Sequence, residues 1–305
     1  MITVRGLKKD FKTFQALKDI DLNVKKGEVY GFIGHNGAGK STTMNILAGL
    51  SRPNAGECLV NGMDIKKISH PGDLNVGYLP EDPRFYTWMT ARETLSYLGK
   101  GNTVANRKRV EEMLSWVGLR EAANRRVGGF SRGMKQRLGI ASALMHDPSL
   151  LILDEPSSAL DPEGRSDVLR LIGELKQMGK TVFFSTHILS DVERICDTVG
   201  MIAAGKIIME KPLDEMQKDH ILPIFDIELT SPLKAHALDK LLGLAGVKDA
   251  KIAENNLSVY VMDTALLSKR LMTFFAGEDV PVLSFGLRKH TLEDIFMKEA
   301  ASHEA

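Results

Sequence analysis

Short apolar runs, bounded by glycine or polar residues, recur along the first two thirds of the chain. Four of them, residues 27–33, 76–80, 150–155 and 181–186, have the length and composition of buried strands. Helical spacing of apolar positions follows the first run, from residue 42 to 48, and ends at a glycine. Buried strands alternating with helices predict an α/β fold.

Other segments of this part carry different patterns. Residues 2–24 contain short β-like runs, and residues 56–62 resemble a strand closed by an Asn-Gly turn. The pattern from residue 90 to 144 is helical, and one helix opens with Ser131 in a capping position. We therefore expect β-structure near the start and a helical insert between the second and third apolar runs.

The pattern changes again at about residue 219. Strand, helix, two strands around a hairpin turn, helix and strand follow one another at residues 224–229, 233–244, 247–252, 257–261, 265–275 and 282–287. That βαββαβ order predicts a small ferredoxin-like domain.

Length and composition suit a soluble globular protein of two domains. The chain has 305 residues, of which 43% are hydrophobic and 26% charged. Its formal net charge of +1 argues against nucleic-acid binding by bulk charge. Because it has no apolar run long enough to span a membrane and Met1–Arg5 is no signal peptide, we expect a cytosolic protein. Cys58 and Cys196 are isolated thiols, to which we assign no role.

The first buried strand leads into a glycine-rich loop that matches the phosphate-binding pattern G-x-x-x-x-G-K-[ST]. Its residues are Gly34, His35, Asn36, Gly37, Ala38, Gly39, Lys40, Ser41 and Thr42. Strand, glycine loop and helix in this order let backbone N–H groups and the positive helix end surround a phosphate. Lys40 would reach the β- and γ-phosphates, and Ser41 would hold Mg²⁺. A glycine-rich turn without a ligand is the weaker alternative, so the loop predicts binding of a nucleoside triphosphate.

Ionisable side chains stand at the ends of the other buried strands. Asp154 and Glu155 end one strand, His187 follows another, and Glu81 lies just past a third. Alone, such residues are often turn, cap or structural residues. Together with a phosphate loop they suit Mg²⁺ binding and activation of water for phosphoryl transfer. Because ligands of open α/β sheets bind at the carboxyl ends of the strands, His187 should face the same crevice.

Two further features concern the nucleotide. The segment Phe130–Arg137 opens a helix whose N-terminus is a second possible anion site. Phe11 and Phe14 precede the phosphate loop, and an aromatic ring there could stack on an adenine. A core or surface aromatic explains them equally well.

Taken together, these motifs resemble the ATPase subunit of ABC transporters, over roughly the first 215 residues. The matching segments are Gly34–Thr42 for the Walker A loop, Phe130–Gln136 for the signature, Leu150–Glu155 for the Walker B strand, Ser158–Asp161 for the D-loop, His187 for the switch histidine and Phe11 for the adenine-stacking aromatic. The resemblance implies a P-loop ABC ATPase core with an antiparallel β subdomain and a helical subdomain at about residues 85–145. It divides the chain into a nucleotide-binding domain, 1–218, and a ferredoxin-like accessory domain, 219–305.

Two positions depart from the family pattern. The signature is usually Leu-Ser-Gly-Gly-Gln, whereas this chain has Phe130-Ser131-Arg132-Gly133-Met134, which keeps the serine and the second glycine. Glu81 stands where the family has a glutamine. A carboxylate there can still reach Mg²⁺ or its water, but it adds negative charge beside a triphosphate.

The resemblance also implies how ATP and Mg²⁺ are used. Two copies, or one copy and a homologous ATPase, would sandwich two ATP molecules, so that Ser131 and Gly133 bind the γ-phosphate held by the partner's loop. The remaining roles would be metal binding by Asp154, activation of water by Glu155, a γ-phosphate contact by His187 and a link across the interface by Asp161.

Transport is the function that the resemblance implies. The chain would power an exporter whose permease subunits are separate, and would lie on the inner face of the cell membrane. Tails similar to Leu292–Phe296 occur in ATPase subunits of bacterial ABC-2-type exporters. The alternative is a soluble ABC-type ATPase acting on ribosomes or nucleic acid, but those usually carry two cassettes, long charged linkers or zinc insertions. A silent nucleotide sensor is disfavoured because Lys40, Asp154, Glu155 and His187 are all present.

Overall fold

The structure is a computed structural model that describes residues 1–99, 103–219, 221–289, 292–293 and 295. The chain forms two compact units, Met1–Leu213 and Asp214–Ile295. The first unit contains two sheets and the second unit one, and each unit has its own hydrophobic core.

An antiparallel sheet begins the first unit. Its strands are β1 (Ile2–Phe11), β2 (Phe14–Val24), β4 (Ala55–Val60) and β5 (Met63–Asp64), in the order β2-β1-β4-β5. The predicted Asn-Gly turn joins β4 to β5, with φ 51° at Asn61 and 79° at Gly62, which suits a type I′ hairpin. The antiparallel part expected from the sequence is therefore present.

A six-stranded sheet contains the four buried strands predicted from the apolar runs. They are β3 (Val29–Ile33), β6 (Val76–Leu79), β7 (Leu150–Leu153) and β8 (Thr181–Thr186). Two strands that we did not predict, β9 (Thr198–Ala203) and β10 (Lys206–Pro212), complete the order β10-β9-β3-β8-β7-β6. Neighbouring strands run parallel, except for β9 and β10. The carboxyl ends of β3, β7 and β8 consequently meet at one edge of the sheet.

Helix α1 (Lys40–Leu47) lies in the core between the two sheets. It contacts β2 on one side and β7 and β8 on the other. Tyr30 and Phe32 of β3 point into this core, and their rings lie 5.1 and 5.3 Å from that of a phenylalanine on β8. Gly31 points the opposite way, where an added Cβ would lie 2.7 Å from the Cys196 sulfur. The strand that leads into the phosphate loop is thus packed on both faces.

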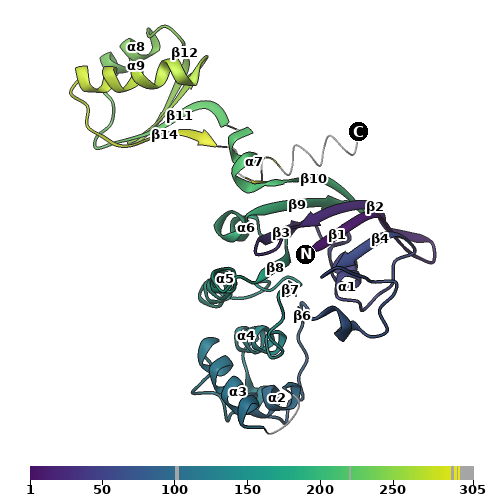
Figure 1. Cartoon of the computed structure of the whole chain (residues 1–305). Coiled ribbons are helices and arrows are strands. Elements are labelled where there is room, and N and C mark those ends of the chain that lie inside the picture. Colours follow the sequence, from purple (N-terminus) through teal and green to yellow (C-terminus); the bar gives the residue numbers. More distant parts are fainter. Residues whose placement is uncertain (100–102, 220, 290–291, 294, 296–305) are drawn as a thin grey trace. The chain divides into compact units, whose positions relative to one another are not determined.

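Helices cover the rest of the first unit (Figure 1). α5 (Pro162–Gln177) and α6 (Leu189–Ile195) pack on the second face of the six-stranded sheet. The predicted helical insert lies between β6 and β7 and contains α2 (Ala91–Leu98), α3 (Val104–Trp116) and α4 (Arg132–Ala143), with a short 3₁₀ helix at Val127–Gly129. Another short 3₁₀ helix, Pro71–Leu74, lies before β6. Ser131 caps α4 as predicted, because its Oγ accepts a hydrogen bond from the Met134 N–H at 3.2 Å.

The second unit has the element order expected from its pattern. After α7 (Leu213–Asp219) come β11 (Ile221–Leu229), α8 (Ala235–Leu242), β12 (Val247–Ala253), β13 (Asn256–Val261), α9 (Thr264–Gly277) and β14 (Val282–Lys289). The antiparallel sheet has the order β12-β13-β11-β14, and both long helices pack on the core side. Asp294 and Phe296 of the predicted exporter-like tail lie outside the described residues.

The opposite side of this second sheet is polar. Arg288 donates to Asp226 from Nε at 2.8 Å and also from Nη2, and Ser258 donates to the same carboxylate. Chiefly through the Arg288 hydrogen bonds, these contacts hold the pKa of Asp226 below its usual value. The side chains of β11, β13 and β14 are therefore tied together on the solvent side as well as in the core.

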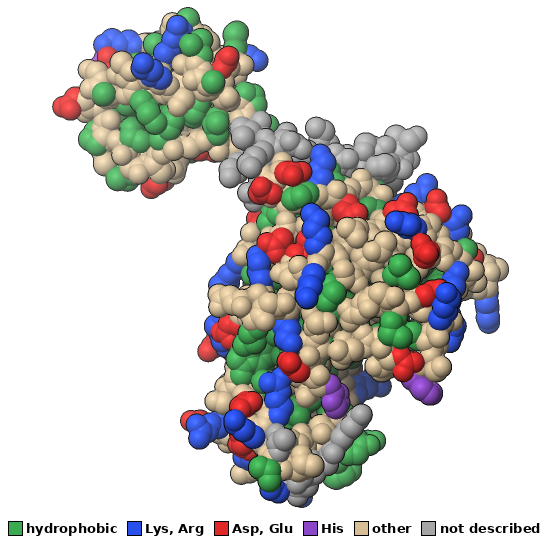
Figure 2. Space-filling model, in the orientation of Figure 1, with side chains coloured by type: hydrophobic (Ala, Val, Ile, Leu, Met, Phe, Trp, Pro, Cys, Tyr) green, Lys and Arg blue, Asp and Glu red, His purple; other side chains and the backbone are tan. Residues whose placement is uncertain are grey.

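On the face of the first unit seen in Figure 2, acidic and basic side chains are interspersed rather than gathered by sign. This matches the net charge of +1. Within the described part of the chain, no helix combines the length and apolar character needed to cross a membrane.

Candidate active site

Glycines shape the loop between β3 and α1. Gly39 caps α1 with φ 113°, and an added Cβ there would lie 2.7 Å from Leu17 Cδ2 and 3.0 Å from the Ala16 carbonyl oxygen. Gly37 also has a left-handed φ, 81°. Because α1 is capped by a glycine and not by a polar side chain, the N–H groups of its first turn are left for an anion. The loop therefore has the backbone that the sequence motif predicts.

Lys40 lies in the middle of the site and its side chain is only 6% exposed. Its Nζ donates to the Gly34 carbonyl oxygen at 2.7 Å and to that of His35 at 3.3 Å. The same Nζ is 3.2 Å from Glu155 Oε1, on the far side of the loop. This oxygen is buried, and the contact with Lys40 is an ion pair without hydrogen-bond geometry. The ammonium group is thus fixed by the loop and faces a carboxylate.

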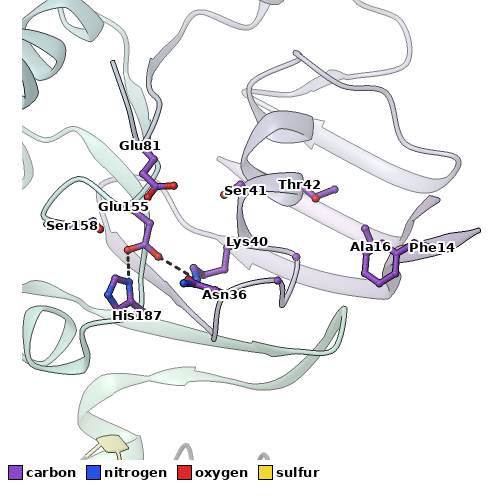
Figure 3. Close-up of a pocket in the computed structure, with 12 residues that line it drawn as sticks. Phe14, Ala16, Asn36, Lys40, Ser41, Thr42, Glu81, Glu155, Ser158 and His187 are labelled. Carbon is purple, nitrogen blue, oxygen red and sulfur yellow. Dashed lines mark hydrogen bonds and ion pairs between the residues drawn. The ribbon is translucent and has the colours of Figure 1, made fainter. Parts of the chain in front are cut away.

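Glu155 joins Lys40 to His187 (Figure 3). Its second oxygen, Oε2, lies 2.8 Å from His187 Nδ1. Its backbone has φ 47°, a left-handed conformation that non-glycine residues adopt only where the surroundings hold them. Its N–H donates to Ser185 Oγ at 2.9 Å. Glu155, after the carboxyl end of β7, and His187, after that of β8, are therefore in direct contact, as expected for neighbouring parallel strands.

Asp154 is buried beside Glu155. Its Oδ1 accepts a hydrogen bond from Ser185 Oγ at 2.6 Å, so that Ser185 contacts both acidic residues at the end of β7. Burial, with a further contribution from the Asp154 charge, raises the pKa of Tyr78 to about 12. The protonated Tyr78 hydroxyl donates to Asn45 Oδ1 of α1 at 3.2 Å. Sequence reasoning missed Ser185, although a hydroxyl within the apolar strand β8 was a signal.

A cavity of about 390 Å³ opens over the loop and the strand ends. Its lining comes from the loop, the start of β2 and the segments just after β6, β7 and β8: Phe14, Ala16, Asn36, Gly37, Gly39, Lys40, Ser41, Thr42, Glu81, Glu155, Ser158 and His187. The two aromatic residues considered for adenine stacking lie in different places. Phe14 lines the cavity, whereas Phe11 lies across the β1–β2 hairpin with half its surface exposed and Lys9 over its ring.

The cavity offers oxygen ligands of the kind that Mg²⁺ prefers. Ser41 contributes a hydroxyl and Glu81 a carboxylate to the lining, and the buried Asp154 precedes the lining residue Glu155 in the chain. Protein-bound Mg²⁺ usually has one or two protein oxygen ligands, and phosphates and waters complete its octahedron. These residues fit that ligand set. The described residues form no group of three or more His, Cys, Asp and Glu side chains that could hold a metal alone.

Eight predicted site residues do not line this cavity: Phe11, Gly34, His35, Ala38, Ser131, Gly133, Asp154 and Asp161. Ser131 and Gly133 lie at the start of α4 in the helical insert, and an added Cβ at Gly133 would meet only Leu160, at 4.0 Å. Asp161 caps α5, with Oδ1 accepting from the Gly164 N–H at 3.3 Å. One chain therefore carries two separate helix N-termini, at Lys40 and at Ser131.

Comparison with known proteins gives consistent results. The ABC transporter family model matches residues 17–158. The chain is 37% identical to the uncharacterized ABC transporter ATP-binding protein YxlF of Bacillus subtilis, over 98% of this chain and 99% of the relative. It is 36% identical to the bacitracin transport ATP-binding protein BcrA of Bacillus licheniformis, over 98% and 96%. A solved dimeric ATP-binding cassette in a post-hydrolysis state with ADP and Pi matches with a TM-score of 0.65 and 27% identity, over 70% of this chain and 99% of that one.

Proposed function

We propose, given that this chain belongs to the ABC transporter family as an ATP-binding subunit with ATPase activity, that its ATP hydrolysis powers an exporter whose permease is a separate chain. The observation that carries the proposal is the cavity in which the Lys40 loop, Glu155 and His187 meet. Similarity to BcrA, whose name specifies bacitracin transport, supports export. We further propose that the chain acts in the cytoplasm, on the inner face of the membrane.

Phosphoryl transfer asks a protein mainly for positioning and charge stabilisation. The N–H groups at the start of α1 and the Lys40 ammonium would bind the β- and γ-phosphates. The phosphate oxygens would compete with Glu155 for the Lys40 ammonium group. The Glu155 carboxylate would then be free to orient and deprotonate water. His187 would contact the γ-phosphate while its Nδ1 stays on Glu155 Oε2, 2.8 Å away. Magnesium, held by Ser41, Asp154 and Glu81 directly or through water, would neutralise phosphate charge.

The adenine would lie at the end of the cavity formed by Phe14 and Ala16. The family resemblance assigns this stacking to Phe11 instead, which remains a prediction. Both rings sit at the tip of the β1–β2 hairpin, where they pair directly across the strands. An aromatic face at this tip can stack on any purine, so it contributes affinity more than specificity.

Two copies would complete the site. Because Ser131 and Gly133 do not line the cavity of their own chain, their helix end is available for the γ-phosphate bound to another chain. A head-to-tail dimer, of two identical chains or of this chain and a homologue, would place the two helix ends on opposite sides of each ATP. Asp161 would link the two sites across this interface. The dimeric state of the solved cassette supports this arrangement.

The second unit would be an accessory domain. Its βαββαβ order and its strand order β12-β13-β11-β14 support a ferredoxin-like assignment. We propose domains 1–218 and 219–305, with dimer stability and partner docking as equally supported roles for the second. The alternative of a soluble ATPase on nucleic acid finds no support in the net charge of +1 or in the interspersed charges of Figure 2.

Dimer formation gives the direct test of the sandwich. A Glu155→Gln variant, which should bind ATP without hydrolysing it, is expected to run at twice the monomer mass in MgATP by light scattering. Adding Ser131→Ala should return it to the monomer mass, since the change removes the cap of α4 at the proposed γ-phosphate contact. Adding Ser115→Ala, on the exposed side of α3, is the control and should leave the dimer intact. A monomer in MgATP for Glu155→Gln itself would rule out the sandwich.

A further inference from the structure

A fully buried aspartate lies behind the active site and has no part in the mechanism above. Asp191 belongs to α6, and its side chain is 1% exposed. Oδ1 accepts a hydrogen bond from Arg165 Nε at 2.6 Å, and Oδ2 accepts one from Ser157 Oγ at 2.6 Å. A carboxylate buried this deeply needs both a counter-charge and hydrogen bonds. Asp191 is therefore held rigidly between two other segments of the chain.

One of these segments carries Glu155. The Ser158 N–H donates to the Glu155 carbonyl oxygen at 3.1 Å, which closes a turn around Ser157. Glu155 and Ala159 both have left-handed backbones, with φ 47° and 52°. Conformations of this kind persist only where neighbouring contacts enforce them. The buried bond from Ser157 to Asp191 is such a contact, in the middle of the strained turn.

The segment of Asp191 itself carries His187. Asp191 follows His187 by one helical turn, and α6 begins at Leu189 between them. Arg165, from the first turn of α5, donates to Asp191 and also to Ser190 Oγ, at 2.7 Å from Nη2. Its guanidinium thus contacts two consecutive residues of α6. Movement of the α6 start would break these bonds together with the one to Ser157.

We propose that Asp191 is a positioning residue for ATP hydrolysis, which, through Ser157 and Arg165, fixes the Glu155 turn relative to His187. The 2.8 Å contact between Glu155 and His187 depends on how these two segments are placed relative to each other. This inference rests on the proposed roles of Glu155 and His187. Asp191 touches no nucleotide, because the cavity lining does not include it. Its effect should therefore appear in turnover and not in ATP affinity.

The test compares Asp191→Asn with Asp147→Asn in the full chain. Asp147 is an ion-paired aspartate near the amino end of β7, the opposite end from the site. Asp191→Asn should lower kcat about 10- to 10²-fold, the size expected when a reacting group is misplaced from a distance, with the Kd for ATP unchanged. Asp147→Asn should keep the parent kcat. Ser157→Ala, which removes one of the two bonds, should show a smaller loss of kcat.

A double variant separates positioning from general destabilisation. If Asp191 acts through Glu155, adding Asp191→Asn to Glu155→Gln should leave the residual hydrolysis rate unchanged. A purely structural role would lower the rate by the same factor in both backgrounds.

Each outcome decides a different claim. Parent-level kcat in both Asp191→Asn and Ser157→Ala would overturn the inference while leaving the ATPase assignment intact, and an equal loss in both backgrounds would also overturn it. A parent protein that hydrolyses no ATP would instead refute the proposed function. Should Asp191→Asn fail to fold, Ser157→Ala in the two backgrounds decides by the same criteria.

Discussion

Replacing Glu155 by glutamine should reduce ATP hydrolysis by about 10²-fold or more, the usual effect of losing a general base. The change keeps the size of the side chain but removes the charge that would take a proton from water. Glutamine can still hydrogen-bond His187, and the Lys40 ammonium keeps its carbonyl acceptors Gly34 and His35. The variant should therefore fold and bind MgATP as the parent does. Steady-state phosphate release and equilibrium ATP binding measure the two quantities separately.

The matched control for Glu155→Gln is Glu57→Gln. Glu57 is an exposed glutamate of β4, paired with Arg5 at 3.7 Å, on the antiparallel sheet. Neutralising it changes the net charge by the same amount without touching the cavity. Hydrolysis by Glu155→Gln at the rate of Glu57→Gln would show that Glu155 does not activate water.

Replacing Lys40 by alanine should abolish both tight ATP binding and hydrolysis. The ammonium group is nearly fully buried and faces the cavity from the loop. Losing one partner of a buried charge pair costs about 2–5 kcal/mol, so ATP affinity should fall by about 30-fold or more. Hydrolysis should fall further, because charge that develops on the phosphates in the transition state is no longer neutralised.

A second effect of Lys40→Ala concerns Glu155. Its Oε1 would remain buried without the ammonium group 3.2 Å away, so the loop should also lose stability. Lys180→Ala is the control, since Lys180 is a largely buried lysine paired with Asp147 near the amino end of β8. Titration with a fluorescent ATP analogue and a urea unfolding curve compare the two variants. Equal ATP affinity in both would contradict the role given to Lys40.

The parts of the site that the sequence predicted are those fixed by local chain geometry. The loop needs positive φ at positions 37 and 39, which glycine adopts without strain, and a glycine loop before a helix presents its N–H groups to an anion. The four apolar runs became parallel neighbours or near neighbours in one sheet. Because parallel strands end at the same edge, Glu155 and His187 had to come close.

The parts that the sequence did not predict depend on contacts between distant segments. Ser185 and Asp191 look like an ordinary strand serine and helix aspartate, and only the fold brings them to Asp154 and Ser157. β9 was missed although residues 199–203 form an apolar run, and β10 was missed because its mixed polarity gives no clear period and its pairing with β9 decides its state. The turn at Lys12 sets the register of β1 against β2 and so determines which aromatic ring reaches the cavity. Sequence composition does not predict this register.

A single capture experiment shows whether this ATPase drives a separate membrane permease. Tagged Glu155→Gln is purified with MgATP from detergent-solubilised membranes of the native cell, and the proteins that accompany it are identified by mass spectrometry. We expect one dominant partner with several membrane-spanning segments, in a fixed ratio to the ATPase. Ribosomal proteins or nucleic acid, without any membrane protein, would contradict this expectation and favour the soluble ATPase.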